Sequence, residues 1–142
     1  MTAEVATETT HRARVVWEAT KEDIRAHRVD VGGQTVVGSS APEFGGDAKK
    51  ADPEGLFVAA LSACHMLWFL DFARRARLRV TSYEDEAEGR MDGRRFRQVA
   101  LRPRVGFADA VDRALLEELH HRAHEACFIA NSVSCLVKIE PR

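Results

Sequence analysis

The stretch "ADPEGLFVAALSACHMLWFL", residues 51–70, is the most apolar part of the 142-residue chain. Asp52 and Pro53 match an N-cap followed by proline at the first helical position, and Glu54 adds an acid to the first turn. The stretch therefore predicts a helix that begins near residue 53. This helix is apolar nearly all round, which indicates a buried central helix or one covered by a partner subunit.

The same helix is close to the length that crosses a bilayer. Ser62, His65 and Asp71 interrupt it with polar groups, and two arginines follow it without a second span. We therefore expect no membrane role. The first twelve residues, "MTAEVATETTHR", lack the basic and apolar regions of a secretory signal, so a cytoplasmic location is expected.

Length and composition favour one globular domain. With 45% hydrophobic and 30% charged residues, the chain can bury a core of ordinary size. We predict a polar tail over residues 1–11 and a single domain over 12–142. The 21 basic and 22 acidic residues give a net charge of -1, so no overall field attracts nucleic acid. The glycine pairs lack the spacing of phosphate loops, and no cofactor is expected.

Short β-branched runs predict about six strands around two helices, an α+β fold. Residues 12–18 and 26–37 predict a first sheet segment, with a hairpin turn at Gly32-Gly33. A second hairpin is predicted over residues 78–107, with its turn at Asp92-Gly93. The alternating residues 132–140 predict the last strand.

A second helix is predicted over residues 110–127, with Asp109 as its cap. Its apolar stripe comprises Val111, Leu115, Leu119, Ala123 and Ala126. In the last strand, Cys135 falls on the apolar side, where a free cysteine is a small core residue.

The other two thiols are the candidates for chemistry. Three cysteines in a reducing compartment are more often free, catalytic or metal-binding than paired in structural disulfides. Cys64 lies in the middle of the first helix. Cys127 ends the second helix, with His120 and His124 on nearly the same side. These positions leave three interpretations open: core cysteines, a reactive thiol pair, or a metal site built on His120, His124 and Cys127.

Two separated motifs favour the reactive pair. The run "DPEGLFVAALSACH", residues 52–65, is followed some sixty residues later by "AHEACFIANSV", residues 123–133. Together they resemble the OsmC/Ohr family of thiol-dependent hydroperoxide reductases. The resemblance covers most of the chain in order and implies an OsmC-like fold, assembled as an intertwined homodimer with two active sites at its interface.

The resemblance also implies roles for individual residues. Cys64 stands at the peroxidatic cysteine, Cys127 at the resolving cysteine and Glu54 at the family's glutamate. The family pairs an arginine from the N-terminal strands with the reactive thiolate; Arg25 and Arg28 are both available here, and we favour Arg25. The implied substrate is an organic hydroperoxide. An external dithiol, of which a lipoyl group is one candidate, would reset the enzyme without cofactor or metal.

Three positions depart from the family's pattern. Asp52 replaces an asparagine, Phe128 stands where proline commonly follows the second cysteine, and Cys135 is an extra thiol. None of these changes removes a reacting group. Phe128, however, changes the turn that presents Cys127.

Peroxide reduction by a cysteine requires charged groups near the reactive thiol. A thiol with a pKa near ~8.5 is mostly protonated at neutral pH, so a nearby arginine is needed to favour the nucleophilic thiolate. A carboxylate such as Glu54 can hold that guanidinium. Ten helical residues span about 15 Å, however, so Glu54 requires a broken helix, a bridging arginine or a partner chain to act on Cys64.

The surroundings of Cys64 bear on the substrate. Phe57, Leu61, Trp68 and Phe69 would suit an alkyl or acyl hydroperoxide if they surround an open site, although such residues are also ordinary core. A member of the same fold that binds a ligand or a metal without turnover is the alternative function.

Overall fold

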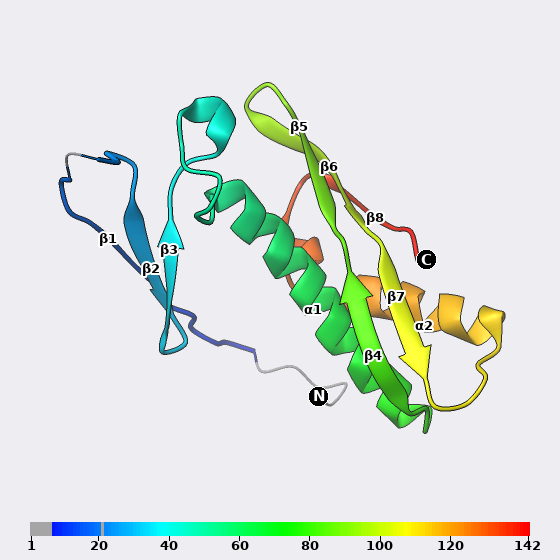
Figure 1. Cartoon of the computed structure of the whole chain (residues 1–142). Helices are drawn as coiled ribbons and strands as arrows, with labels where there is room; N and C mark the ends of the chain where they lie inside the picture. The colour runs from blue at the N-terminus through cyan, green and yellow to red at the C-terminus, as the bar shows by residue number, and fades with distance from the viewer. Residues whose placement is uncertain (1–6, 21) are drawn as a thin grey trace. The chain divides into compact units, whose positions relative to one another are not determined.

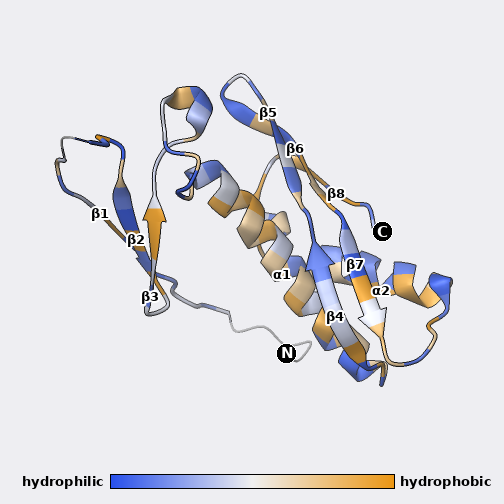
Figure 2. Cartoon of the chain, viewed as in Figure 1, coloured by the Kyte–Doolittle hydropathy of each residue, from blue (hydrophilic) through white to orange (hydrophobic). Residues whose placement is uncertain are grey.

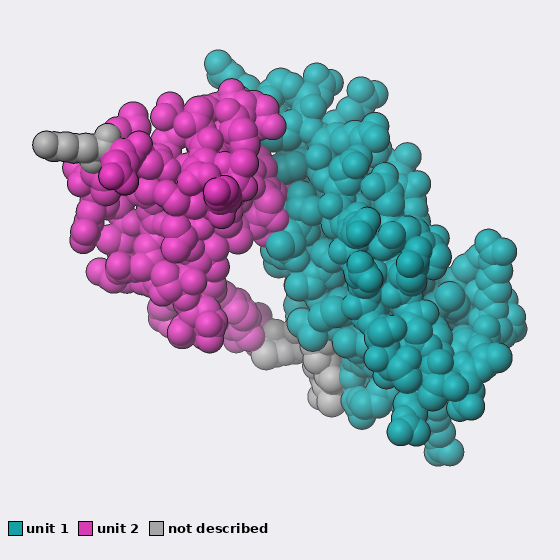
Figure 3. Space-filling model, in the orientation of Figure 1, with its two compact units in different colours: residues 1, 58–142 teal, residues 2–57 magenta. Residues whose placement is uncertain are grey.

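The computed structural model describes residues 7–20 and 22–142 and confirms an α+β fold with two α-helices (Figure 1). The chain forms two compact units, Thr2–Phe57 and Val58–Arg142 (Figure 3). The proposed division into a tail over 1–11 and one domain over 12–142 stays a prediction. In chain order the elements are β1 (Arg14–Trp17), β2 (His27–Val31), β3 (Gln34–Gly38), η1 (Pro42–Phe44), α1 (Pro53–Arg75), β4 (Val80–Asp85), β5 (Glu88–Asp92), β6 (Arg95–Leu101), β7 (Pro103–Phe107), α2 (Arg113–Ala126), η2 (Ala130–Ser132) and β8 (Leu136–Ile139).

The first unit is built on a three-stranded antiparallel sheet in the order β1-β2-β3. Gly32 and Gly33 form the β2–β3 turn at φ values of 58° and 75°. Both values lie in the left-handed region that glycine adopts at little cost, so the predicted hairpin is confirmed. A bridge between Gly38 and Ala51 then brings the chain from the end of β3 to the start of α1.

Helix α1 begins at Pro53, as predicted from its capping residues. The Leu56 N–H donates to the Asp52 carbonyl at 3.1 Å, which makes Asp52 the acceptor of an opening helical hydrogen bond. Figure 2 shows hydrophobic residues over much of this helix. It has the length and apolar composition of a membrane span, criteria that the core helix of a globular protein also meets.

The second predicted hairpin is confirmed, but each of its two long strands is divided. β5 pairs with β6 near the turn and β4 pairs with β7 further away, so the described part of the chain has eight strands instead of about six. At the division the Arg102 N–H donates to Asp85 Oδ1 at 2.6 Å, and Pro103 has no N–H to donate. The Ser62 hydroxyl donates to Asp85 Oδ2 at 2.5 Å. Asp85 thereby links the hairpin to α1.

The core of the second unit lies where α1 and α2 pack together over β4 and β7. Phe69 of α1 and Leu119 of α2 are almost completely buried. Burial of each such side chain contributes about 1.5–3 kcal/mol. The buried cluster comprises Trp68, Phe69, Phe72, Ala73, Leu119, Ala123 and Cys127, and the strand residues packed against it include Val80, Tyr83, Val105 and Phe107.

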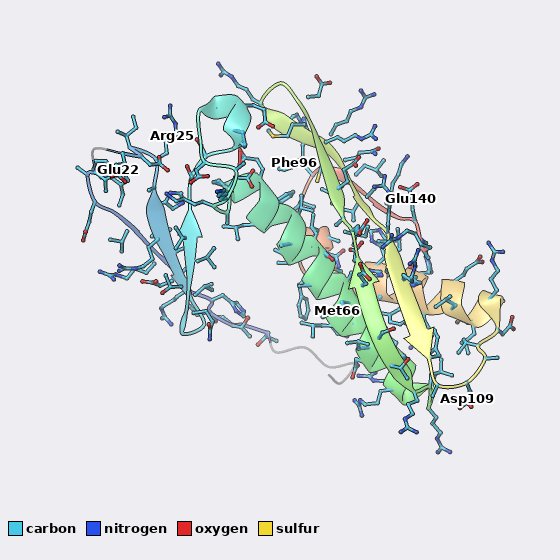
Figure 4. The ribbon with its side chains drawn as sticks, viewed as in Figure 1. Glu22, Arg25, Met66, Phe96, Asp109 and Glu140 are labelled. Atoms are coloured by element: carbon cyan, nitrogen blue, oxygen red, sulfur yellow. The ribbon has the colours of Figure 1, made fainter. Side chains whose placement is uncertain are left out.

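Helix α2 begins later than predicted, and the assignment of Asp109 as its cap is wrong. The N-cap is Asp112, whose Oδ1 accepts a hydrogen bond from the Ala114 N–H at 3.2 Å. Asp109 lies in the loop after β7 (Figure 4). The chain stays bonded to the sheet through the Ala108 N–H and the Arg79 carbonyl at 2.9 Å, so it can turn into a helix only beyond this point.

The last strand is shorter than predicted. β8 spans Leu136–Ile139 and pairs in parallel with β6. The predicted alternation is confirmed, because Val137 and Ile139 are half-buried and their neighbours are exposed. Cys135 immediately precedes the strand and is only half-buried, so it is less of a core residue than its place in the pattern indicates.

Candidate active site

Cys64 lies near the middle of α1, on the boundary between its buried and exposed faces. The thiol is half-buried and packs against the core cluster. Leu61 and Phe69 are completely buried and Trp68 nearly so, which makes them core residues rather than the walls of an open site. Leu67, on the exposed side of the helix, keeps 56% of its surface accessible. Cys64 is therefore reachable from an apolar surface.

Cys127 occupies the C-cap of α2 and faces inward. Only 1% of its surface is exposed. Its φ and ψ of −63° and 115° end the helix, and its sulfur accepts a hydrogen bond from the Ala130 N–H at 3.4 Å. The end of α2 thus turns its thiol into the core.

The turn after Cys127 is held without the proline common in the family. The Asn131 side chain donates to the carbonyls of Glu125 and Cys127, both at 2.9 Å. The Phe128 ring packs edge-on against Trp68, with centroids 5.3 Å apart. Asn131 thus holds the turn that carries Cys127, a role not predicted from the sequence although the residue lies within the motif around Cys127. These contacts present Cys127 to the core with Phe128 in the place of the proline.

The structure brings the two predicted thiols together. Cys64 and Cys127 interact directly through their side chains. Burial, together with this contact, raises the pKa of Cys127 to about 11, while the amides of Ala130 and Ile129 oppose the rise. At neutral pH Cys127 is therefore a protonated thiol beside a more accessible Cys64.

A buried histidine pair lies in the same helix–helix contact and was not predicted. His65 Nε2 and His120 Nδ1 are 3.0 Å apart, and both side chains are at most 3% exposed. The His120 ring also stacks on Phe69, with centroids 4.3 Å apart. One ring nitrogen must donate and the other accept, so the bond requires that the two imidazoles are not both protonated. A histidine on the apolar side of each helix is the sequence signal for this pair.

Burial keeps both imidazoles neutral. Loss of solvation, reinforced by the neighbouring His120 and His124, lowers the pKa of His65 to about 3. Loss of solvation also lowers the pKa of His120 to about 4, although the Asp85 carboxylate opposes this shift. Both groups are therefore uncharged near pH 7.

The two candidate arginines differ in their surroundings within the first unit. Arg28 Nε lies 3.2 Å from a carboxylate oxygen of Asp30 and forms an ion pair with it. Among the described residues no such carboxylate partner is found for Arg25, which is exposed and lies just before β2 (Figure 4). Its guanidinium carbon is 3.3 Å from the position that a Cβ on Gly45 would take. Arg25 is thus the arginine that remains available for another anion.

Glu54 lies in the first turn of α1, as predicted. Because α1 is continuous from Pro53 to Arg75, the possibility that the helix breaks between Glu54 and Cys64 is excluded. Ten residues along one helix span about 15 Å, so Glu54 needs an intermediary or a second chain to influence Cys64. The roles of Glu54 and Arg25 stay predictions.

The structure gives no support to the metal site that His120, His124 and Cys127 suggested. Within residues 7–20 and 22–142, no group of three or more histidine, cysteine or acidic side chains is placed to hold a metal ion. The physical reason is the direction of the side chains. His120 is bonded to His65, and the Cys127 sulfur faces Cys64 and the Ala130 amide.

The comparisons with known proteins bear on this thiol pair. The family model for OsmC-like proteins matches residues 46–142, which include both thiols and Glu54. The chain belongs to the OsmC-like family. An OsmC-like protein of unknown function from Vibrio cholerae is 36% identical, with a TM-score of 0.85 over 95% of this chain and 100% of that one.

Other OsmC-like structures are similar in fold at lower identity. An organic hydroperoxide resistance protein from Elizabethkingia anophelis is 19% identical, with a TM-score of 0.72, covering 95% of this chain and 98% of its own. The organic hydroperoxide resistance protein OsmC from Legionella pneumophila is 18% identical, with a TM-score of 0.69, covering 94% and 97%. Among curated proteins no sequence match is found.

The histidine pair predicts that stability falls as the pH is lowered from 7 towards 4. Unfolded histidines take up protons near pH 6.5, whereas folded His65 and His120 do so only near 3 and 4. The unfolded state therefore binds more protons in this pH range. Each histidine should lower the free energy of unfolding by about 2 kcal/mol at pH 5. Urea unfolding at several pH values measures this loss.

Two variants make the test specific. The double variant His65→Gln/His120→Gln keeps amide hydrogen bonding without titration, so its pH dependence should be flatter. His121→Gln removes an exposed histidine and should keep the original slope. An equal slope in the double variant and the wild type would contradict a buried neutral pair.

Proposed function

We propose that this OsmC-like protein is a cysteine-based peroxidase that reduces organic hydroperoxides to alcohols. The observation that carries the proposal is the direct contact between two thiols of unequal exposure, Cys64 half-buried and Cys127 fully buried. A peroxidase of this kind needs an accessible thiolate and a second thiol close enough to form a disulfide with it.

The proposed reaction has two steps at the thiols. The Cys64 thiolate attacks the terminal oxygen of the hydroperoxide, the O–O bond breaks, and Cys64 becomes a sulfenic acid while an alkoxide leaves and is protonated. The Cys127 thiolate then attacks the Cys64 sulfur, and the S–O bond breaks to give a disulfide and water. An external dithiol returns two electrons by thiol–disulfide exchange. A cytoplasmic location, with its reducing thiols, is part of the same proposal.

The substrate class is argued from the surface beside Cys64. Leu67 and Phe128 are 56% and 45% exposed, and Phe128 packs on Trp68 one helical turn from Cys64. Exposed apolar side chains beside Cys64 favour a peroxide with an alkyl or acyl group over hydrogen peroxide. The similar proteins from Elizabethkingia anophelis and Legionella pneumophila are named for organic hydroperoxide resistance, which agrees with this class.

Arg25 and Glu54 complete the proposal. An arginine beside Cys64 would favour its thiolate, and a carboxylate would hold the guanidinium in position. Arg25 is the better candidate, because Arg28 already pairs with Asp30. Glu54 is proposed to orient Arg25.

Cysteine variants test the proposal directly. Reduced wild-type protein should consume cumene hydroperoxide and afterwards carry a Cys64–Cys127 disulfide, located by peptide mass spectrometry. Cys64→Ser should abolish consumption, because serine cannot replace the thiolate. Cys127→Ser should stop after one equivalent, with Cys64 oxidised and unresolved. Cys135→Ser is the control and should consume the hydroperoxide at the wild-type rate. Slow consumption of the hydroperoxide, with all three wild-type thiols still free, would contradict the proposal.

The two arginines provide a matched pair of substitutions. Arg25→Lys keeps the charge but loses the planar guanidinium, so kcat/KM for the hydroperoxide should fall by about tenfold or more. Arg28→Lys, beside Asp30, should change kcat/KM little. If the larger loss occurs in Arg28→Lys, the assignment is reversed.

A homodimer is proposed on the evidence of exposed apolar side chains. Both units carry such residues, and the most exposed are Val15, Trp17, Ile24, Val37, Phe44 and Leu67. Exposed apolar surface on this scale is typical of an interface. Sedimentation equilibrium should give twice the monomer mass of 15.8 kDa, and a monomer at micromolar concentrations would contradict the proposal.

A further inference from the structure

The buried Cys127 thiol has few polar groups around it. Cys127 is 1% exposed, so solvent has almost no access to its thiol. Among residues 7–20 and 22–142, the polar groups found in contact with it are the N–H groups of Ala130 and Ile129 and the thiol of Cys64. Two of these three groups are hydrogen-bond donors, so the Cys64 sulfur is the one that can accept the Cys127 S–H.

The proposed peroxide reduction needs a proton at this place. Breaking the O–O bond releases an alkoxide, and a positioned acid that protonates it contributes typically 10²–10⁴-fold to such a step. His65 and His120 are uncharged near pH 7 and bonded to each other. An arginine side chain stays protonated throughout, because a guanidinium is not deprotonated in proteins. Cys127 is the group that both carries a releasable proton and touches the reacting sulfur.

We propose that Cys127 acts twice, first as the proton donor for peroxide cleavage at Cys64 and then as the resolving nucleophile. This inference rests on the proposed peroxidase function. In the first step Cys64–S⁻ takes the terminal oxygen of ROOH, the O–O bond breaks, and the Cys127 proton passes to the departing RO⁻ to give ROH. In the second step Cys127–S⁻ attacks Cys64–SOH, and the hydroxide that leaves takes a proton from solvent.

This order gives the buried position of Cys127 a chemical purpose. A thiol that stays protonated in the reduced protein does not compete with Cys64 for the peroxide. Transfer of its proton to the alkoxide produces the thiolate only after the sulfenic acid exists, when a nucleophile is needed. The Ala130 N–H, 3.4 Å from the sulfur, is in position to stabilise the thiolate that forms.

The test isolates the first step from the second. Cys127→Ala and Cys127→Ser are made in a Cys135→Ser background and compared with that background in a single turnover with cumene hydroperoxide. Oxidation of Cys64 is followed by rapid quenching, trapping with dimedone, and mass spectrometry, and in the background the Cys64–Cys127 disulfide is counted together with the trapped sulfenic acid. Neither variant can form the disulfide. Alanine removes the donor, while serine keeps a hydroxyl in its place. Circular dichroism spectra of both variants are recorded to check that they fold like the background protein.

The expected result is a first step at least about tenfold slower in Cys127→Ala than in the background, with Cys127→Ser in between. The background should also react more slowly in D₂O than in H₂O, and this isotope effect should be lost in Cys127→Ala. A structural disturbance alone would not remove the isotope effect.

The outcomes distinguish a failure of the proton-donor role of Cys127 from a failure of the proposed peroxidase function. Formation of the sulfenic acid at the background rate in both variants, with the same isotope effect, would overturn the proton-donor role and leave the peroxidase intact. If Cys64 is not oxidised in any variant, the proposed function itself fails.

Discussion

The packing of α1 against α2 is the constraint on which the rest of the second unit depends. The two helices share one buried cluster, and side chains of β4 and β7 cover it. Within this contact Cys64 meets Cys127 and His65 meets His120. Because protein interiors are close-packed, the surrounding aromatic and aliphatic side chains fix the distance between the two thiols and the distance between the two imidazoles.

The same contact makes two chemically similar thiols different. Cys64 lies at the edge of the apolar face of α1, whereas Cys127 lies at the inward-facing end of α2. Burial disfavours the thiolate of Cys127, and its contact with Cys64 adds to that effect. This difference in burial supports the proposed roles, with Cys64 as the nucleophile and Cys127 as the resolving thiol.

The buried histidine pair carries a cost in stability. Burial of polar groups is unfavourable unless their hydrogen bonds are satisfied, and this pair makes one bond between its own members. His65 follows Cys64 in sequence, and His120 is two helical turns before Cys127. The bond between them therefore joins the segments that carry the two thiols and favours one register between the helices.

The sequence by itself determined the elements with strong local signals. Proline at the first helical position marked the start of α1, glycine pairs and Asp-Gly marked the hairpin turns, and two motifs carried the family and both thiols. It did not distinguish Asp109 from Asp112 as a cap, because either carboxylate can accept an N–H and a bond to the sheet at Ala108 decides where the helix can begin. Only the tertiary structure decided that Asp85 is bonded where the hairpin divides, that Asn131 holds the turn after Cys127, and that His65 and His120 bind each other. Each of these depends on contacts between residues distant in the chain, which local propensity and periodicity do not encode.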